Sequence, residues 1–197
     1  MPYRVEEFEV GGIYHIFNRG ALKNPLFFSP EMYWTFCYLI ERFAADYHIR
    51  VLQVCLMPNH FHLLIMLEEG GSVEDFMQRL CHTYARRINR LLRRIGTIFQ
   101  GRYGSTHINS TEYVFEICRY IHLNPITENM VAHPADWEYS SYHEAIGERN
   151  VIKIDNDFVP SLFGGQRPYE AYILNSLHNR KYWSSELLQG LAKMKLV

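Results

Sequence analysis

Two histidines one residue apart are the first side chains in this sequence that suggest chemistry. His60 and His62 lie in the run HFHLLIML. Side chains two positions apart on a β-strand project from the same face, roughly 7 Å from each other. That spacing suits two imidazoles that converge on one metal ion. Such a pair is also common where one histidine is exposed and the other is core, so a third ligand is needed.

A later helix supplies candidates for that third ligand. Tyr120 and Asn124 are four residues apart, which places a phenol and an amide on one helical face, one turn from each other. An aromatic residue followed by an asparagine near a helix end also serves packing and capping. The functional interpretation therefore requires that this helix lie against the sheet face that carries the histidines.

Four motifs resemble the REP-associated tyrosine transposases, a branch of the single-tyrosine HUH transposases of insertion sequences. HUH stands for two histidines that flank a hydrophobic residue. The resemblance covers about residues 13–145 and continues more faintly into LFGGQRPYEAYI (162–173). The motifs, in chain order, are MPNHFHLLI (57–65), FQGRYGS (99–105), RYIHLNPITENMV (119–131) and DWEYSSY (136–142).

The resemblance implies a ferredoxin-like core, DNA cleavage and joining without ATP, and a divalent metal, Mg²⁺ or Mn²⁺. It assigns the metal-binding histidines to His60 and His62, the nucleophile to Tyr120 and a polar metal ligand to Asn124. Since two imidazoles favour a transition ion, Mn²⁺ satisfies the family and the donor set best. Attack by tyrosine on a metal-polarised phosphate would leave a 5′-phosphotyrosyl link and a free 3′-hydroxyl. His122 stands where the family often has an acid; it lies about 200° round the helix from Tyr120, so we expect it outside the metal site.

The segment 76–111 is strongly basic. It contains seven arginines and no Asp or Glu, so it carries +7, whereas the rest of the chain carries −8. A solvated helical face normally mixes charges that pair four residues apart. This segment has no acid to pair with, so we predict that it binds phosphate. The predicted DNA-binding residues are Arg79, Arg86, Arg87, Arg90, Arg93, Arg94, Arg102 and Tyr103.

Aromatic residues and glycines in the same segment suggest further DNA contacts. Tyr84, Phe99 and Tyr103 are candidates for stacking on unpaired bases, although burial in the core is at least as good an explanation for Tyr84. Gly101 and Gly104 would permit a close backbone approach to DNA.

A sheet and helices must position these residues. Strands are predicted over 11–18, 49–57, 60–67 and 103–109, and Pro58 and Asn59 form the turn of a hairpin. Capping residues predict one helix from Ser29 to about Tyr47, a second from Ser72 to Gly96, and a third from Ser110 that Pro125 should end; a last helix is expected near Tyr169 to Leu177.

This order predicts an α+β protein with a ferredoxin-like βαββαβ core, in which helices cover one face of an antiparallel sheet. The helix that carries Tyr120 follows the core. We assign residues 1–145 to a catalytic domain and 146–197 to a partly helical C-terminal extension.

Composition limits the class of protein. Of 197 residues, 48% are hydrophobic and 15% aromatic, which excludes global disorder. The longest apolar stretches fall far short of the ~20 residues of a membrane span, and the N-terminus lacks a targeting pattern. We therefore expect a cytoplasmic protein, and the resemblance to the transposases implies a bacterial one associated with the nucleoid. Four cysteines without metal-site spacing should pack in the core: Cys37, Cys55, Cys81 and Cys118.

The sequence as a whole predicts a single-strand DNA endonuclease and strand transferase that acts on single-stranded DNA or a hairpin, such as a repetitive extragenic palindrome, as a monomer or homodimer. One alternative is a domesticated relative that binds hairpin DNA or structured RNA without cleavage. Another is a small-molecule metallohydrolase with a deep closed pocket, for which the arginines would be irrelevant.

Overall fold

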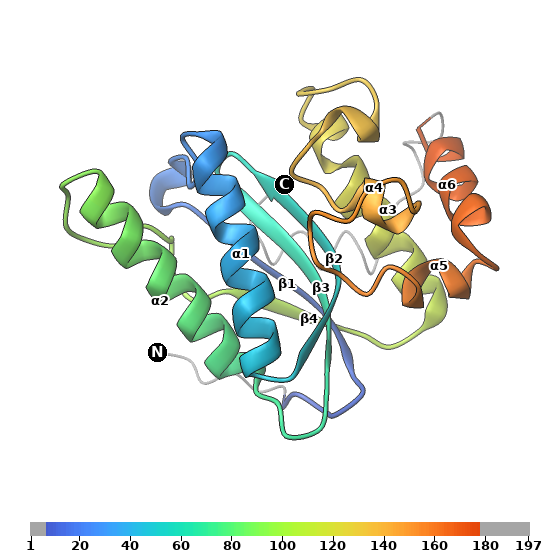
Figure 1. Ribbon diagram of the computed structural model, residues 1–197, viewed down its shortest axis with the longest axis horizontal. Helices are drawn as coiled ribbons and strands as arrows, with labels where there is room; N and C mark the ends of the chain where they lie inside the picture. The colour runs from blue at the N-terminus through green and yellow to red at the C-terminus, as the bar shows by residue number, and fades with distance from the viewer. Residues whose placement is uncertain (1–6, 178–197) are drawn as a thin grey trace.

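A four-stranded antiparallel sheet lies at the centre of the protein, whose computed structural model describes residues 7–177 (Figure 1). The strands are β1 (Ile13–Arg19), β2 (Ile49–Met57), β3 (His60–Leu67) and β4 (Gly104–Ile108). They lie in the order β2-β3-β1-β4, and every neighbouring pair is antiparallel. This is the strand order of the ferredoxin-like arrangement, so the predicted fold class is confirmed.

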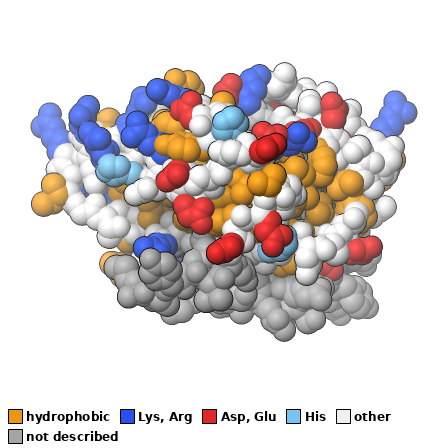
Figure 2. Space-filling model, turned by 90° about the horizontal axis from the view of Figure 1, so that it is seen from below, with side chains coloured by type: hydrophobic (Ala, Val, Ile, Leu, Met, Phe, Trp, Pro, Cys, Tyr) orange, Lys and Arg blue, Asp and Glu red, His pale blue; other side chains and the backbone are white. Residues whose placement is uncertain are grey.

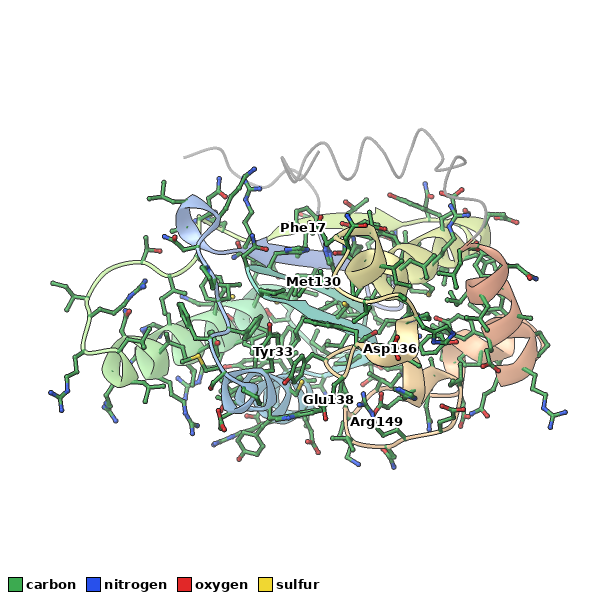
Figure 3. The ribbon with its side chains drawn as sticks, turned by 90° about the horizontal axis from the view of Figure 1, so that it is seen from above. Phe17, Tyr33, Met130, Asp136, Glu138 and Arg149 are labelled. Atoms are coloured by element: carbon green, nitrogen blue, oxygen red, sulfur yellow. The ribbon has the colours of Figure 1, made fainter. Side chains whose placement is uncertain are left out.

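Helices lie on both faces of the sheet. The helices α1 (Pro30–Asp46) and α2 (Val73–Leu91) cover one face, as predicted, and α3 (Thr111–Thr127) lies against the other. Figure 3 shows Tyr33 of α1 on one side of the sheet and Phe17, which packs with α3, toward the other. The shorter elements are η1 (Ala21–Lys23), η2 (Pro134–Asp136), α4 (Tyr142–Ala145), α5 (Phe158–Leu162) and α6 (Gln166–Asn175).

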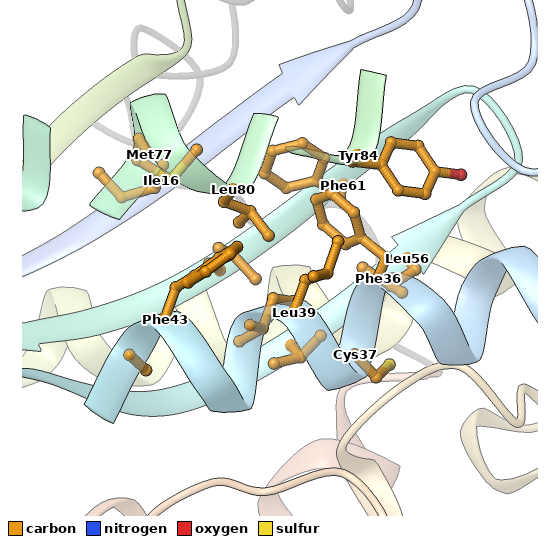
Figure 4. Packing of buried hydrophobic residues seen from close by; sticks show 14 of the residues in the cluster. Ile16, Phe36, Cys37, Leu39, Phe43, Leu56, Phe61, Met77, Leu80 and Tyr84 are labelled. Atoms are coloured by element: carbon orange, nitrogen blue, oxygen red, sulfur yellow. The ribbon is translucent and has the colours of Figure 1, made fainter. Parts of the chain in front are cut away.

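Side-chain alternation along the strands divides the interior into two cores. In β1, Ile16 points to α1 and α2, whereas Phe17 points to α3. The first core is rich in aromatic rings, with the ring of Phe36 5.0 Å from that of Phe61 and 4.9 Å from that of Tyr84 (Figure 4). Tyr84 is fully buried and donates to the carbonyl of Leu26 at 2.7 Å. Its role is therefore core packing, not base stacking.

The second helix ends five residues earlier than the sequence predicted. It stops at Leu91, whose side chain is 64% exposed, and Ile95 is 97% exposed. Arg93 then takes a left-handed conformation with φ of 49°. The apolar residues continue at helical spacing as far as Ile95, but beyond Leu91 residues 7–177 offer no protein surface for them to pack against. The prediction to Gly96 was wrong because periodicity carries no information about where that surface ends.

The third helix continues two residues beyond Pro125, which was predicted to end it. Proline has no N–H, so the helix lacks one hydrogen bond to the carbonyl of Ile121. The helix continues to Thr127 because Ile126 is buried in the second core. Beyond it, the N–H of Met130 donates to the carbonyl of Pro125 at 2.9 Å.

The fourth motif, DWEYSSY, has a structural explanation. It runs along the outer edge of β2, where the N–H of Leu56 donates to Tyr139 O at 3.0 Å and the N–H of Ser141 donates to Val54 O at 2.9 Å. Asp155 extends this cover, since its N–H donates to Val51 O at 2.7 Å. A covered edge cannot pair with another chain.

The described part of the predicted C-terminal extension packs on the outer side of α3. Helix α6 begins three residues earlier and ends two residues earlier than predicted. Its Tyr169 and Ile173 are fully buried in the same core as Ile117 and Ile121 of α3. Residues 146–177 therefore press α3 against the sheet.

Two predictions from composition can be compared with residues 7–177. All four cysteines are free; Cys37, Cys55 and Cys118 are buried and Cys81 is half-buried, in agreement with a packing role. Across this described range, none of the helices is both long enough and apolar enough to cross a membrane.

The glycines of FQGRYGS have different surroundings. A Cβ at Gly104 would overlap the ring of Phe17, whereas a Cβ at Gly101 would meet open space. The interpretation of Gly104 as a point of DNA approach was therefore wrong, because the ring of Phe17 occupies the space that a side chain at position 104 would take. Gly101 remains free for such an approach.

These two glycines give a matched test of the β1–β4 pairing. Gly104→Ala should lower the free energy of unfolding by about 1–3 kcal/mol, the usual cost of overpacking, because Phe17 must move. Gly101→Ala should change it by less than about 1 kcal/mol. Urea unfolding measures both, and equal effects of the two substitutions would contradict the packing argument.

Candidate active site

Four polar side chains converge between the sheet and α3. The hydroxyl of Tyr120 and the Nδ2 of Asn124 each lie 3.3 Å from Nε2 of His62. Asn124 Oδ1 lies 3.3 Å from Nε2 of His60. None of the four side chains is more than 5% exposed. The structure thus brings together every residue of the predicted catalytic and metal-binding set, within one chain.

The local sequence explains this convergence. His60 and His62 are two apart on β3 and so share the face that packs against α3. Ser110 caps α3 by accepting from the N–H of Tyr113 at 3.1 Å, which fixes where the helix begins. Tyr120 and Asn124 then lie one turn apart on its inner side.

The orientation of His60 is set by its neighbour Asn59. The amide nitrogen of Asn59 donates to the carbonyl of Lys23 at 3.3 Å, so its Oδ1 turns toward His60. This oxygen lies 2.7 Å from His60 Nδ1 and can only accept, so the ring must donate from Nδ1. Nε2 of the neutral ring is therefore a bare lone pair that faces Asn124.

The second histidine has a partner on the neighbouring strand. Nδ1 of His62 lies 3.0 Å from Nε2 of His15, and the two ring planes are within 24° of parallel with centroids 5.1 Å apart. His15 is only 1% exposed. Each histidine of the pair is thus held at Nδ1, and Nε2 of each points toward α3.

The donor set fits a metal ion. Nε2 of His60 and Oδ1 of Asn124 face each other as two acceptors, and no hydrogen bond can join two lone pairs. A cation attracts both, together with Nε2 of His62. Two imidazoles and one amide oxygen would leave positions for water or phosphate oxygens. Among the described residues, no group of three or more His, Cys, Asp or Glu side chains could hold a metal, so this mixed set is the candidate.

Burial keeps these histidines neutral at pH 7. It lowers the pKa of His15 to about 3 and is the main cause that lowers the pKa of His60 to about 4. The pKa of His62 is also well below 6.5, first because of burial and then because His60 and His15 are close. A neutral imidazole is the form that binds metals.

Tyr120 is a protonated phenol in this setting. Burial raises its pKa above the ordinary value of 10, and the hydrogen bond with Asn124 lowers the pKa by a smaller amount. Phenolate is the nucleophilic form, so the group needs nearby positive charge to react at neutral pH. The hydroxyl already points at His62, where a cation would lie.

Three residues near the site were not predicted: His15, Asn59 and Arg19. Arg19 is the last residue of β1 and lies directly opposite His60 in the strand register, and its charge lowers the pKa of His60. His15 lies within the strand predicted over 11–18, but its partner depends on which strands pair. Asn59 was treated as a turn residue, and its amide also orients His60.

His122 lies away from the metal set, as expected. Its Nδ1 is 3.1 Å from the hydroxyl of Ser140, and its ring packs edge-on against Tyr142 and Tyr169. It is completely buried on the outer side of α3, and burial lowers its pKa to about 3.

The arginines of α2 do not lie beside the catalytic set, because α2 covers the opposite face of the sheet. Between α1 and α2 runs a groove of about 1150 Å³, which one acid, Glu31, also lines. Lys and Arg side chains gather at the end of the molecule where α2 ends (left in Figure 2). Four of the predicted DNA-binding residues line the groove: Arg79, Arg86, Arg87 and Arg90.

The remaining predicted DNA-binding residues lie along the loop from α2 to β4. Arg93 and Arg102 are exposed, and Arg94 is exposed but donates to Asn89 and Thr97. Tyr103 is half-buried and packs against the first core, so its ring is partly used by the fold. In the same loop Gln100 accepts a hydrogen bond from Arg19, which links the loop to the His60 end of the sheet.

The buried histidines predict how stability depends on pH. In unfolded chains His122 titrates near 6.5, and in the folded protein near 3. The contribution of each such group to the free energy of unfolding is therefore fully present above pH 6.5. As pH falls below that value, the contribution decreases by about 1.4 kcal/mol per pH unit. Urea unfolding in EDTA between pH 7 and 5 measures this slope. His122→Gln should make it shallower; an unchanged slope would contradict the assigned burial.

Comparison with protein families identifies relatives of this chain. The family model described as "Transposase IS200 like" matches residues 10–124, more than half of the chain. A Haemophilus influenzae protein, whose name assigns it as a candidate to the REP-associated tyrosine transposases, is 26% identical over 115 residues. That alignment covers 52% of this chain and 64% of the relative, so the chain accounts for less than two thirds of the relative's length. These findings confirm the resemblance inferred from the motifs.

A solved structure shares the fold. It is described as a REP-associated tyrosine transposase bound to a REP hairpin. The TM-score is 0.65 at 17% sequence identity, over 78% of this chain and 91% of that one. At this identity the likeness concerns the fold.

Proposed function

Because the chain belongs to the family of IS200-like transposases, we propose that it is a metal-dependent single-strand DNA endonuclease and strand transferase. The observation that carries this proposal is the convergence of His60, His62, Asn124 and Tyr120 within hydrogen-bond distance. A protein that only bound DNA would have no need to bury these four polar groups together. A small-molecule hydrolase would not need the arginines.

Tyr120 is the nucleophile in this proposal. Its phenol oxygen forms a bond to the scissile phosphorus as the bond from phosphorus to the 3′-oxygen breaks. The phenol proton leaves Tyr120, and the departing 3′-oxygen gains a proton to become a free 3′-hydroxyl. The product is a 5′-phosphotyrosyl link whose bond energy is conserved, so attack by another 3′-hydroxyl can reverse the step and join strands.

His60, His62 and Asn124 would hold a divalent ion, for which Mg²⁺ and Mn²⁺ are the candidates and Mn²⁺ suits two imidazoles better. When bound, such an ion polarises the phosphate and favours phenolate. The chain's own residues supply the orientation: both imidazoles present Nε2, and α3 places the Tyr120 hydroxyl 3.3 Å from His62. Their burial also limits access of water that would hydrolyse the covalent link.

The proposed substrate is single-stranded DNA beside a hairpin. The solved relative with the same fold is bound to a REP hairpin, and the arginines of α2 provide a surface for phosphates. Since that surface and Tyr120 lie on opposite faces of the sheet, the arginine groove would hold the paired stem while the unpaired strand reaches the catalytic face. Such binding would bring the protein to the nucleoid.

The complete set in one chain bears on oligomeric state. Tyr120 lies beside His62 of its own chain, so cleavage would not need a second copy. This supports action as a monomer.

Tyr120→Phe tests the proposed chemistry directly. The wild-type protein with Mn²⁺ and a 3′-labelled single-stranded hairpin substrate should form a covalent adduct visible by denaturing electrophoresis. Tyr120→Phe should form none, because the nucleophilic oxygen is absent, while hairpin affinity stays within about threefold. A 5′-labelled substrate should release a shorter free strand instead.

A matched control variant sharpens this experiment. Tyr113→Phe removes a phenol from the same helix and should keep the adduct. If Tyr120→Phe still forms the adduct, the proposed mechanism is wrong. Hairpin binding that is equal with and without metal, with no adduct from the wild type, would instead support the non-cleaving binding protein.

The arginine groove predicts a salt dependence of hairpin binding. Arg86→Gln and Arg90→Gln should each weaken binding and reduce the slope of log affinity against log salt by about 0.7–0.9, the value for one lost phosphate contact. Arg167→Gln, at an exposed position on α6, is the matched control and should leave the slope unchanged. Fluorescence anisotropy at several salt concentrations gives these slopes. Equal slopes for the groove variants and the control would exclude the groove as the surface that binds DNA phosphates.

A further inference from the structure

We infer that His15 is a positioning residue for the proposed metal site: it accepts a hydrogen bond from Nδ1 of His62 and so keeps the lone pair of His62 Nε2 free for the ion. The inference rests on the proposed function, in which His62 binds metal. It concerns a third histidine, which contacts neither the side-chain amide of Asn124 nor the predicted position of the ion.

The direction of the hydrogen bond follows from the contacts of His62. Nε2 of His62 lies 3.3 Å from Nδ2 of Asn124, which can only donate. A metal ion at His62 also requires the lone pair of Nε2, so in the metal-binding form the one proton of the neutral ring is on Nδ1. Nδ1 lies 3.0 Å from Nε2 of His15, so His62 donates and His15 accepts.

The opposite direction would disable the site. If His15 donated, the proton of His62 would be on Nε2, where it would face the amide hydrogens of Asn124. No lone pair would remain for a metal. A donor-only residue at position 15 is thus incompatible with a metal site at position 62, and an acceptor is required.

The fold holds His15 in place for this role. Phe17 is opposite His62 in the β1–β3 register, and His15, two residues before it on β1, reaches His62 diagonally. Its ring plane is within 24° of that of His62, which suits a hydrogen bond between the two rings, and its ring meets that of Tyr120 edge-on, 6.0 Å away. An imidazole this deeply buried is costly unless it is hydrogen-bonded, and His62 provides that bond.

This arrangement mirrors the one at His60. Asn59 accepts from Nδ1 of His60 with an amide oxygen, and His15 accepts from Nδ1 of His62 with an imidazole nitrogen. Metal-binding histidines generally donate from their other ring nitrogen to such a partner, whose loss weakens metal affinity by about 10- to 100-fold. His15 thus completes the same arrangement for the second ligand.

Two substitutions separate positioning from packing. His15→Phe keeps an aromatic ring of similar size and removes the acceptor. His15→Gln restores an amide oxygen that can accept. Mn²⁺ affinity, measured by titration without DNA, should fall about 10- to 100-fold in His15→Phe and recover to within about fivefold of wild type in His15→Gln.

A measurement free of metal and DNA tests the same inference. In ¹⁵N-labelled apo protein, NMR of the histidine rings should show His62 protonated on Nδ1 in the wild type and in His15→Gln. His15→Phe should move a substantial fraction of the proton to Nε2. A purely structural His15 would lower the melting temperature of both variants and leave this ratio unchanged.

Three outcomes would overturn the inference: wild-type His62 protonated on Nε2, an unchanged ratio in His15→Phe, or an unchanged Mn²⁺ affinity in that variant. The first needs no variant, so it decides even if His15→Phe fails to fold. Failure of the proposed function is seen separately, as absence of the Tyr120 adduct in wild type. An adduct with no effect of His15→Phe on Mn²⁺ affinity would refute only the positioning role.

Discussion

Polar groups confined between β3 and α3 constrain the whole site. Each buried donor or acceptor without a partner costs about 1–3 kcal/mol, so the hydrogen-bond pattern among these side chains is nearly fixed by exclusion. Asn59 fixes His60, and Asn124 with His15 fixes His62. With the Asn124 amide in this orientation, Nε2 of His60 faces Oδ1 of Asn124, and no placement of protons on neutral rings joins the two by a hydrogen bond. A cation between them would bind to both.

The two faces of the sheet carry different kinds of side chain. One face packs a largely apolar and aromatic core under α1 and α2, and arginines of α2 line the groove between these two helices. The other face carries the histidines and receives α3. Because β-strand side chains alternate, one short strand such as β1 can supply Ile16 to the first core and His15 to the site. In the proposed function, phosphate binding and catalysis thus use opposite faces of a single sheet.

The sequence predicted those features that local pattern determines. Alternation and turn residues predicted four strands, and capping residues located the starts of α1, α2 and α3. Helix ends were less predictable, because Leu91 and Pro125 end or continue a helix according to what lies beside them. The residues His60, His62, Tyr120 and Asn124 were found through spacing and family motifs. His15 was not, since its role depends on β1 pairing with β3, which no local pattern specifies.

Helix α3 works as a middle layer, and this explains why the site depends on distant parts of the chain. Its inner side presents Tyr120 and Asn124 to the sheet, whereas its outer side buries His122 against Tyr142 and Tyr169. A helix with polar residues on both sides cannot be held by one apolar stripe. It needs a second layer, which residues 134–177 supply. The position of the tyrosine hydroxyl relative to His62 is therefore set by packing on the far side of the helix as much as by β3. The same dependence explains why α3 continues past Pro125: Ile126 belongs to the core that this outer layer closes.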